Sequence, residues 1–331
     1  MRVVLGSLVL VLAACDAVAP TGGPEAAVPP REPSPDGRAA RVLDEELSRT
    51  VASPDVRSAL AVVLDARTGR ALAMQSLEAD GAFDPERPAR EVRRHGSVVK
   101  PLTVAAALDT GCVEPTDRFE GGELVLAGHR VRDWAPHGAM SLGDVMAFSS
   151  NVGTTRIFER LGREPLIEAL TRAGLGHRIS DAARRDDVRA ARLAYGASFE
   201  ATPLEIAAAF GAIANDGVYR RPWRAGEPRP EGERVLSSDA AASTMALLEG
   251  AVARDDATGR RARVPGYRVA GKTGTVPFGD DAVYGVFVGV APADAPRFVV
   301  LVGVVAGAEQ SGGTVAAPAF ARVARRLLRT G

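Results

Sequence analysis

Lysine is almost absent from this chain of 331 residues. Lys100 and Lys272 are the only lysines among 41 basic residues, and every other basic residue is an arginine. A guanidinium stays protonated at any usable pH, so an arginine cannot take a proton from a nucleophile. A position that must act as a base has to remain lysine, and both lysines are therefore candidates for a chemical role.

Cysteine and histidine are also scarce. Cys15 and Cys112 are the only cysteines, and the four histidines are dispersed at positions 95, 129, 137 and 177. None of these residues pair at metal-ligand spacing, so a zinc site has no support, and we expect neither a metal nor a cofactor. Cys112 follows an apolar helical run and is predicted to be a small core residue.

An excess of charge of either sign is lacking too. The 41 basic and 41 acidic residues cancel, which argues against nucleic acid as a partner and against a surface that binds anionic membranes. A hydrophobic content of 46% with 25% charged residues is ordinary for a globular protein with a sizeable core. The length allows one large domain or two small ones.

The N-terminus has the pattern of an export signal. The charge at Arg2 precedes an apolar run, residues 3–12, that is too short to cross a bilayer as a helix. Residues 12–15, Leu-Ala-Ala-Cys, resemble the lipobox of bacterial lipoproteins, whose cysteine is lipidated. We therefore expect a lipoprotein signal peptide over residues 1–14 and lipidation of Cys15. The alternative is an ordinary signal peptide cut after Ala19, although Pro20 would hinder that cleavage.

Residues 15–37 are rich in proline, alanine and glycine, which predicts an unfolded tether ahead of a folded domain at 38–331. Acyl chains on Cys15 would hold the protein on a membrane without a transmembrane helix. By the sorting known for lipoproteins of some Gram-negative envelopes, Asp16 implies retention at the inner membrane. The expected location is thus the outer, periplasmic face of the cytoplasmic membrane.

Hydrophobic periodicity predicts the order of elements in the folded domain. A helix over residues 38–51 is followed by two apolar strands, 59–64 and 71–74, with turn residues between them; the region from 101 to 265 is mostly helical, and strands at 266–275, 283–291 and 297–306 precede a closing helix at 318–328. Within the helical region, helices are predicted at 102–108, 142–148, 153–161, 165–173 and 203–214. The apolar character of both sides of the first strand pair indicates a sheet covered on both faces.

Ser97 and Lys100 lie three residues apart, which on a helix puts both side chains on one face. Pro101 fits early in a helix, so Ser97 is expected near the helix start, with an N–H group free to bind an oxyanion. Alone, such a pair is more often a helix-capping serine with a solvated lysine than a catalytic pair.

Two further motifs contain the rare residues. Lys272-Thr273-Gly274-Thr275 is predicted on a strand where the glycine lets a ligand backbone approach, while the lysine and threonines receive a carboxylate. Ser149-Ser150-Asn151, at the end of a helix, holds one of only two asparagines in the chain. Each motif alone could be a turn or a capping loop, but their order and the shortage of lysine indicate that they belong together.

The three motifs in this order resemble those of the transpeptidase domain of penicillin-binding proteins. The likeness covers about residues 55–330 and includes the blocks 149–153, 202–207, 214–217, 266–275, 287–293 and 316–318. It implies an α/β fold, in which an antiparallel five-stranded sheet is covered by helices on both faces and carries an inserted all-helical lobe.

The resemblance also implies a serine D,D-transpeptidase that acts on the D-Ala-D-Ala end of peptidoglycan stem peptides and binds β-lactams covalently. Ser97 would attack the penultimate D-Ala carbonyl, Lys100 would take its proton, and Ser149 would relay a proton to the leaving D-Ala. We expect both lysine amines to converge on the Ser97 hydroxyl, and the charge of Lys272 to lower the pKa of Lys100. The N–H groups of Ser97 and Thr275 would form the oxyanion hole. The substrate-binding residues would be Asn151, Lys272, Thr273, Gly274 and Thr275, and cell-wall synthesis proteins would be further partners.

Two departures from the family pattern stand out. His95 replaces the usual proline before Gly96-Ser97, and we interpret it as a loop residue or part of the cleft rim. No N-terminal pedestal or glycosyltransferase domain fits between Gly37 and Ala59, so we expect a bare catalytic domain on a lipid tether.

Three alternatives share the predicted fold. A class A β-lactamase needs a glutamate four residues before an asparagine, which this sequence lacks, and a class D enzyme favours valine where Asn151 stands. A D,D-carboxypeptidase fits the same motifs. A penicillin sensor that is acylated without turnover also fits, because sensors retain both lysines.

Overall fold

The computed structural model describes residues 37–329. The predicted signal peptide, the lipidation site Cys15 and nearly all of the predicted tether lie outside this range, and its first residue, Gly37, already begins a helix. Among the described helices, none combines the length and apolarity needed to cross a membrane.

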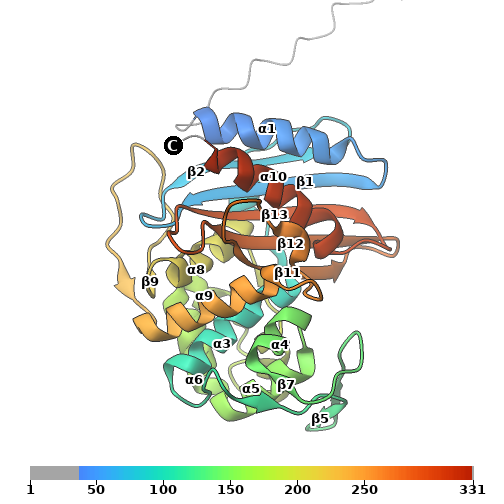
Figure 1. The fold of residues 1–331 in the computed structure, drawn as a ribbon, viewed down its shortest axis with the longest axis vertical. Helices are drawn as coiled ribbons and strands as arrows, with labels where there is room; N and C mark the ends of the chain where they lie inside the picture. The colour runs from blue at the N-terminus through green and yellow to red at the C-terminus, as the bar shows by residue number, and fades with distance from the viewer. Residues whose placement is uncertain (1–36, 330–331) are drawn as a thin grey trace, which may run out of the picture. The chain divides into compact units, whose positions relative to one another are not determined.

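A five-stranded antiparallel sheet forms the centre of the fold, in the order β11-β12-β13-β1-β2 (Figure 1). Its strands are β1 (Val56–Asp65), β2 (Ala71–Glu78), β11 (Ala270–Pro277), β12 (Ala282–Ala291) and β13 (Phe298–Gly307). The predicted strand pair and strand triplet therefore join through β1 and β13, which pair from Val56–Ala306 to Asp65–Phe298. This arrangement leaves β11 as a free edge beside the helical insertion.

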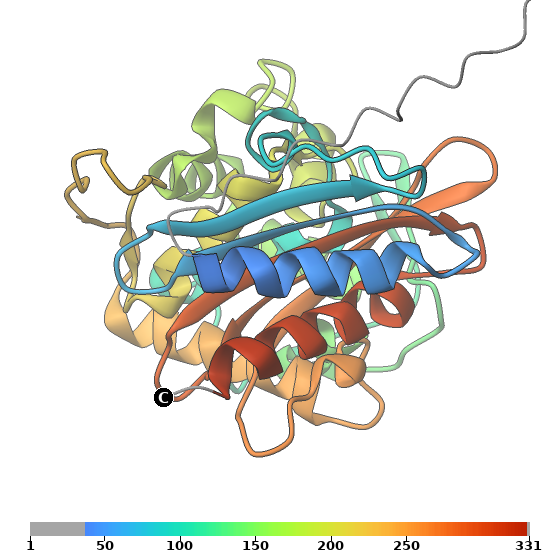
Figure 2. The same ribbon diagram turned by 90° about the horizontal axis from the view of Figure 1, so that it is seen from above.

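Both faces of the sheet are buried, as predicted. Leu60, Val62 and Leu64 of β1 point into the core shared with the helical insertion, whereas the alternating residues Ala61 and Val63 point into a second core. That second core is covered by α1 (Gly37–Val51) and α10 (Ala317–Leu328), which lie side by side across the strands (Figure 2). The apolar pattern on both sides of β1 thus reflects two separate cores.

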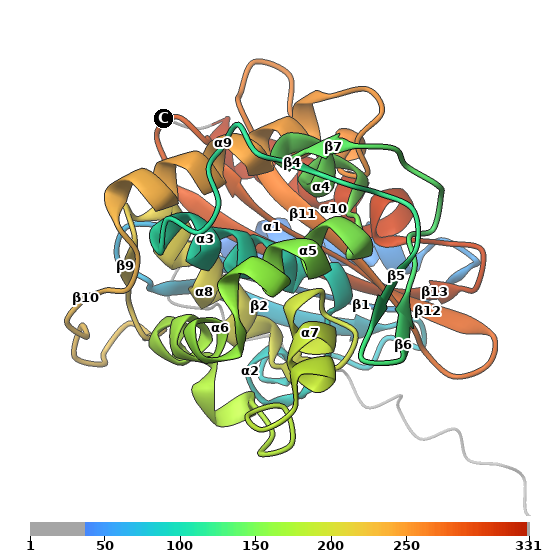
Figure 3. The ribbon, with the colours of Figure 1, turned by 90° about the horizontal axis from the view of Figure 1, so that it is seen from below.

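The insertion between β2 and β11 covers the opposite face of the sheet (Figure 3). Its helices are α2 (Arg87–Arg90), α3 (Lys100–Asp109), α4 (Leu142–Phe148), α5 (Asn151–Leu161), α6 (Arg163–Leu170), α7 (Asp187–Ala194), α8 (Pro203–Ala214) and α9 (Ser238–Ala253). α8 begins with a capping box between Thr202 and Glu205 and packs on β1 and β13. Cys112 is partly buried and packs against this core.

The predicted fold class is confirmed, but the insertion is not wholly helical. It also contains four short two-stranded ladders, formed by β3 (Arg93–Arg94) with β8 (Glu200–Ala201), β4 (Arg118–Phe119) with β7 (Met140–Ser141), β5 (Leu124–Leu126) with β6 (His129–Val131), and β9 (Val218–Tyr219) with β10 (Glu233–Arg234). These strands have two or three residues, which is too short to produce a visible period of two in the sequence. Helices α2, α7 and α9 were also missed.

Candidate active site

Ser97 lies on a tight turn that begins a helix, as predicted. The turn is the 3₁₀ segment η1 (Gly96–Val99), which continues directly into α3. Gly96 has φ +60°, and a side chain there would come within 3.2 Å of the Thr275 carbonyl oxygen. The glycine therefore lets the turn lie directly against β11, and Ser97, in the first turn, has an N–H group without an intrahelical acceptor.

Lys100 is completely buried beneath this turn. Its Nζ donates hydrogen bonds to the Ser149 carbonyl oxygen, to Asn151 Oδ1 at 2.7 Å and to Ser149 Oγ at 3.3 Å. Ser97 Oγ is not among its hydrogen-bond partners in the described part of the chain. Ser97 and Lys100 therefore both lie at the start of one helix. The amine of Lys100, however, is bound by Ser149 and Asn151.

Lys272, on β11, approaches Ser149 from the side of the sheet. It is 1% exposed, and its Nζ donates to Ser149 Oγ at 2.8 Å and to the Thr273 carbonyl oxygen at 3.2 Å. We expected both lysines to converge on Ser97, but the hydroxyl that both reach is that of Ser149. The reason is local: Ser149 ends α4 in the left-handed conformation, φ 60°, which turns it towards both amines.

Burial controls the protonation of this pair. It lowers the pKa of Lys100 well below the ordinary lysine value, and the nearby charge of Lys272 lowers it further, while Asp133 opposes the shift. Burial alone lowers the pKa of Lys272 to about 7. We predicted that Lys272 would depress the pKa of Lys100; it does, but desolvation is the larger cause.

Asp133 organises the segment around Asn151 and was not recognised in the sequence. Its Oδ1 accepts from the backbone N–H groups of Asn151 at 2.5 Å and Val152 at 3.1 Å, and its Oδ2 accepts from Ser150 Oγ at 2.7 Å. A carboxylate therefore caps the start of α5, which begins at Asn151. The contact spans a loop, so no sequence spacing could have indicated it.

Gly274 has a structural role beyond the ligand approach that we expected of it. A side chain there would meet the His95 carbonyl oxygen at 2.1 Å and Val286 Cγ1 at 2.7 Å. The glycine thus makes room for the nucleophile turn, the segment Gly96–Val99 that carries the predicted nucleophile Ser97. On either side, Thr273 Oγ1 donates to Thr258 Oγ1 at 2.9 Å, and Thr275 Oγ1 accepts from the Gly312 N–H at 3.0 Å.

His95 lies in the loop between β3 and η1, as one of our two interpretations expected, but it does not lie at the cleft rim. It is completely buried, its Nε2 is 3.0 Å from the Ala201 carbonyl oxygen, and its ring meets Tyr284 edge-on at 5.6 Å. Burial lowers its pKa to about 4, so the imidazole is neutral at physiological pH. His95 thus directly precedes Gly96-Ser97, and its ring contacts the Ala201 backbone on β8, which pairs with β3.

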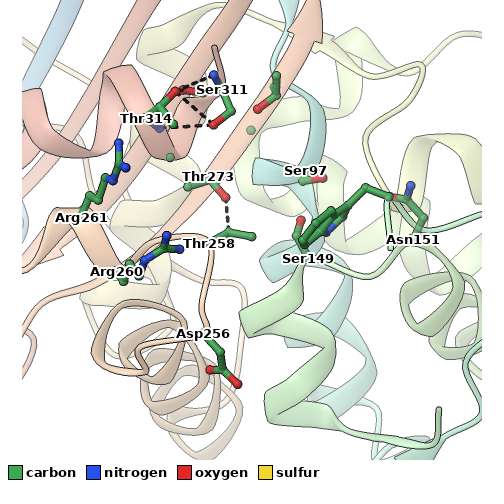
Figure 4. Close-up of a pocket in the computed structure, with 14 residues that line it drawn as sticks. Ser97, Ser149, Asn151, Asp256, Thr258, Arg260, Arg261, Thr273, Ser311 and Thr314 are labelled. Carbon is green, nitrogen blue, oxygen red and sulfur yellow. Dashed lines mark hydrogen bonds between the residues drawn. The ribbon is translucent and has the colours of Figure 1, made fainter. Parts of the chain in front are cut away.

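A cavity of about 550 Å³ opens above these residues (Figure 4). Of the predicted site residues, Ser97, Ser149, Asn151, Thr273, Gly274 and Thr275 line it, and Lys100 and Lys272 are buried beneath it. The lining residues that the sequence did not indicate are Trp134, Asp256, Thr258, Arg260, Arg261, Ser311, Gly313 and Thr314. The described residues include no group of three or more histidine, cysteine or acidic side chains that could hold a metal.

This arrangement is suited to acyl transfer. It brings together an accessible serine hydroxyl, a second serine held by two amines with lowered pKa values, and the edge of a sheet along which an extended peptide could lie.

Comparisons with known proteins agree with this geometry. Residues 59–325 match the family model described as the penicillin binding protein transpeptidase domain. Penicillin-binding protein PbpB of Mycolicibacterium smegmatis is 34% identical over 327 residues, covering 81% of this chain and 50% of that protein. Peptidoglycan D,D-transpeptidase FtsI of Escherichia coli K12 is 29% identical, covering 89% of this chain and 55% of that protein. The chain therefore spans about half the length of these relatives.

Solved structures show the same fold. The transpeptidase domain of Burkholderia pseudomallei penicillin-binding protein 3 superposes with a TM-score of 0.79 at 29% identity, covering 89% of this chain and 94% of that one. Penicillin-binding protein 3 of Mycobacterium tuberculosis in complex with aztreonam gives a TM-score of 0.81 at 29% identity, covering 89% and 77%. With the family model matched over most of its length, this chain belongs to the penicillin-binding protein transpeptidase domain family.

Proposed function

We propose that this protein is a peptidoglycan D,D-transpeptidase that forms an acyl-enzyme at Ser97 and is acylated by penicillins at the same residue. The observation that carries the proposal is the hydrogen bonding of Lys100 Nζ and Lys272 Nζ to the single hydroxyl of Ser149, in the cavity that Ser97 lines. Proton transfer at this position serves both halves of a serine acyl transfer.

In the first half, Ser97 Oγ bonds to the penultimate D-Ala carbonyl carbon, and Lys100 in its neutral form takes the serine proton. Lys100 is suited to this role because burial lowers its pKa. To take the proton, it exchanges a hydrogen bond with Ser149 or Asn151 for one with Ser97 when the substrate binds. The N–H groups of Ser97 and Thr275, on the facing turn and strand, receive the developing oxyanion.

Collapse of the tetrahedral intermediate breaks the peptide bond to the terminal D-Ala, whose nitrogen takes a proton through Ser149. In the second half, an acceptor amine bonds to the same carbon, the ester bond to Ser97 breaks, and the amine proton returns to the serine by the reverse route. Ser149 can relay in both directions because its hydroxyl lies within 3.3 Å of both amines.

Substrate binding is assigned to β11 and to the start of α5. Lys272, Thr273 and Thr275 would receive the terminal carboxylate, and Gly274 keeps their strand against the nucleophile turn. Asn151 would bind the substrate's amide backbone, for which its side chain must release Lys100 Nζ or the Arg132 carbonyl oxygen, at 3.0 Å.

We also propose that lipid on Cys15 anchors the protein to the outer face of the cytoplasmic membrane, with residues 15–37 as the tether of a transpeptidase domain at 38–331. Stem peptides, β-lactams, the membrane and cell-wall synthesis proteins are the expected partners, and nucleic acid is not. Cell fractionation tests the anchor, because Cys15→Ser should move the protein out of the membrane fraction.

The central test is incubation with a fluorescent penicillin, comparing the wild type with Ser97→Ala and following both uptake and loss of the label. Uptake that depends on Ser97 and is followed by slow loss supports the transpeptidase, whereas fast loss indicates a β-lactamase. A pentapeptide donor with an acceptor amine separates the remaining alternatives. Hydrolysis alone indicates a carboxypeptidase, and stable acylation without any product indicates a sensor.

A further inference from the structure

Two arginines form part of the cavity wall without an assigned role. Arg260 and Arg261 lie on the short 3₁₀ segment η4 (Arg260–Ala262), and both line the cavity together with Thr258 and Thr273. Figure 4 shows them on the side of Thr273 and Thr258 that faces away from Ser97, Ser149 and Asn151. They therefore lie at the far end of the cavity, measured from the nucleophile.

The loop that carries these arginines is fixed to its surroundings. The Thr258 N–H donates to the Ala147 carbonyl oxygen at 3.0 Å, and the Gly259 N–H donates to the Ala251 carbonyl oxygen at 3.2 Å. Gly259 is required there because a side chain would come within 2.6 Å of that Ala251 oxygen. The start of η4 is thus held against the ends of α4 and α9.

The positive charge of this wall is not neutralised. Within residues 37–329, neither Arg260 nor Arg261 forms a salt bridge, and Arg260 donates only to the Ala257 carbonyl oxygen at 3.3 Å. The acidic residue of the same wall, Asp256, has its carboxylate bound by Arg254 at 2.9 Å. Two guanidinium groups therefore face the cavity with donors available for an anion.

The terminal carboxylate of the donor peptide does not account for them. That group is assigned to Lys272, Thr273 and Thr275, and residues two apart on a strand are separated by about 7 Å. When the donor carbonyl lies at the N–H groups of Ser97 and Thr275, the terminal carboxylate of the donor lies near Thr273. The donor therefore does not extend as far as the two arginines. The arginines thus lie beyond the donor, on the side that the leaving residue vacates and from which an acceptor can enter.

We propose that Arg260 and Arg261 form an anion subsite that binds a carboxylate of the acceptor strand and so selects acidic acceptors over neutral ones. The inference rests on the proposed function. The bonds formed and broken are those of the second half-reaction: the acceptor nitrogen bonds to the acyl carbon, the ester to Ser97 breaks, and the amine proton returns to Ser97. The arginines position the acceptor and take no part in the proton transfer.

The test uses two acceptors that differ only in one charge. Nα-acetyl-lysine carries one primary amine and one carboxylate, and Nα-acetyl-lysine amide carries the amine alone. A thioester donor acylates the enzyme, and chromatography separates the hydrolysis product from the amine-transfer product. We expect the wild type to favour the carboxylate acceptor by about tenfold in apparent KM, and Arg260→Gln/Arg261→Gln to lose this preference.

The matched control is Arg221→Gln/Arg229→Gln, which removes the same charge from two exposed positions outside the cavity lining. It should retain the preference, and Arg260→Lys/Arg261→Lys should retain part of it. Uptake of fluorescent penicillin should be unchanged in every variant, because the first half-reaction does not use the subsite.

The outcomes separate the two proposals. A wild-type enzyme that is not acylated at Ser97 overturns the proposed function and the subsite with it. An enzyme that is acylated normally and transfers to an acceptor amine, but uses both acceptors equally or keeps its preference in Arg260→Gln/Arg261→Gln, overturns the subsite alone. Normal acylation with transfer to neither acceptor overturns the transpeptidase assignment and the subsite with it.

Discussion

At the scale of single residues, Asp133 holds one of the three motifs in place and acts on the buried lysine of another. Its carboxylate accepts three hydrogen bonds from the segment that contains Asn151, and its charge favours the protonated form of Lys100. A capping residue thus links the position of Asn151 to the protonation of the buried base. The sequence could not indicate this role, because an acidic residue in a loop has no distinguishing pattern.

We predict that Asp133→Ala lowers the free energy of unfolding by about 1–3 kcal/mol and slows acylation by penicillin by about 100-fold. The Ser150 hydroxyl and the N–H groups of Asn151 and Val152 lose their acceptor. The side chain of Asn151, and with it the amine of Lys100 that it binds, is then no longer held in place. Asp186→Ala is the control, because Asp186 caps α7 through the Arg189 N–H away from the cavity lining. It should cost about 0.5–2 kcal/mol and leave acylation unchanged. Equal acylation rates in both variants would contradict the assigned role.

The two lysines also predict how acylation depends on pH. Because the pKa of Lys100 is lowered, its neutral form becomes available well below the pH at which an ordinary lysine loses its proton. The acylation rate should therefore rise with pH and level off before that pH is reached. Lys272, with a pKa of about 7, loses its charge above that pH, which weakens carboxylate binding. We expect a bell-shaped profile of the second-order acylation rate, measured by stopped-flow with a chromogenic β-lactam.

The matched variant is Lys272→Arg, whose charge cannot be titrated in this range. Its overall rate should be lower, but its alkaline limb should disappear. A wild-type rate that climbs about tenfold per pH unit up to pH 10 would mean that Lys100 titrates as an ordinary lysine, and the proposed burial effect would be wrong.

At the scale of elements, the site is a junction between one strand and two helix starts. β11 lies against η1 because Gly274 and Gly96 carry no side chains, and α4 and α5 meet at Ser149-Ser150-Asn151. Most of these elements were predicted from periodicity, including α4 at its observed bounds, 142–148. The glycines were visible in the sequence, but the surfaces they face depend on which elements pack together.

We predict that Gly274→Ala separates β11 from the nucleophile turn, because the added carbon would lie 2.1 Å from the His95 carbonyl oxygen. We expect the free energy of unfolding to fall by about 1–3 kcal/mol and the rate of acylation by penicillin to fall about 100-fold. Gly250→Ala serves as the control: it lies within α9, where an added carbon meets nothing within 4 Å. Thermal unfolding should show it stabilised by about 0.5–1 kcal/mol, with normal acylation. If Gly274→Ala is acylated at the wild-type rate, the proposed contact does not control the site.

At the scale of the whole described chain, the sheet separates the site from the packing of the two end helices. Glu46 on α1, whose side chain is 4% exposed, pairs with Arg322 at 2.8 Å and with Arg326 at 3.2 Å on α10. The first and last helices of the fold are therefore joined by a buried carboxylate across the second core. This face is opposite the helical insertion that contributes Ser97, Lys100 and Asn151.

We predict that Glu46→Ala lowers the free energy of unfolding by about 2–3 kcal/mol, because Arg322 loses its carboxylate partner and Arg326 keeps only the exposed Glu45. Glu45→Ala is the control, since its carboxylate is 60% exposed and pairs with Arg326 alone. It should cost less than about 0.5 kcal/mol. Urea denaturation measures both, and penicillin acylation should be normal in each. A loss of acylation in folded Glu46→Ala would show that the end helices do influence the site.

The sequence by itself determined which side chains are able to do the chemistry and which elements carry them, because amine scarcity, motif order and hydrophobic period are properties of neighbouring residues. Only the tertiary structure decided what those side chains touch. The hydrogen bonds that join Ser149 Oγ to the two lysines span 49 and 123 positions. The contacts of Asp133, the burial of His95 and the lack of a salt bridge to Arg260 or Arg261 within residues 37–329 likewise depend on packing between elements. Desolvation, which lowers the pKa values of both lysines, exists only after the chain has folded around them.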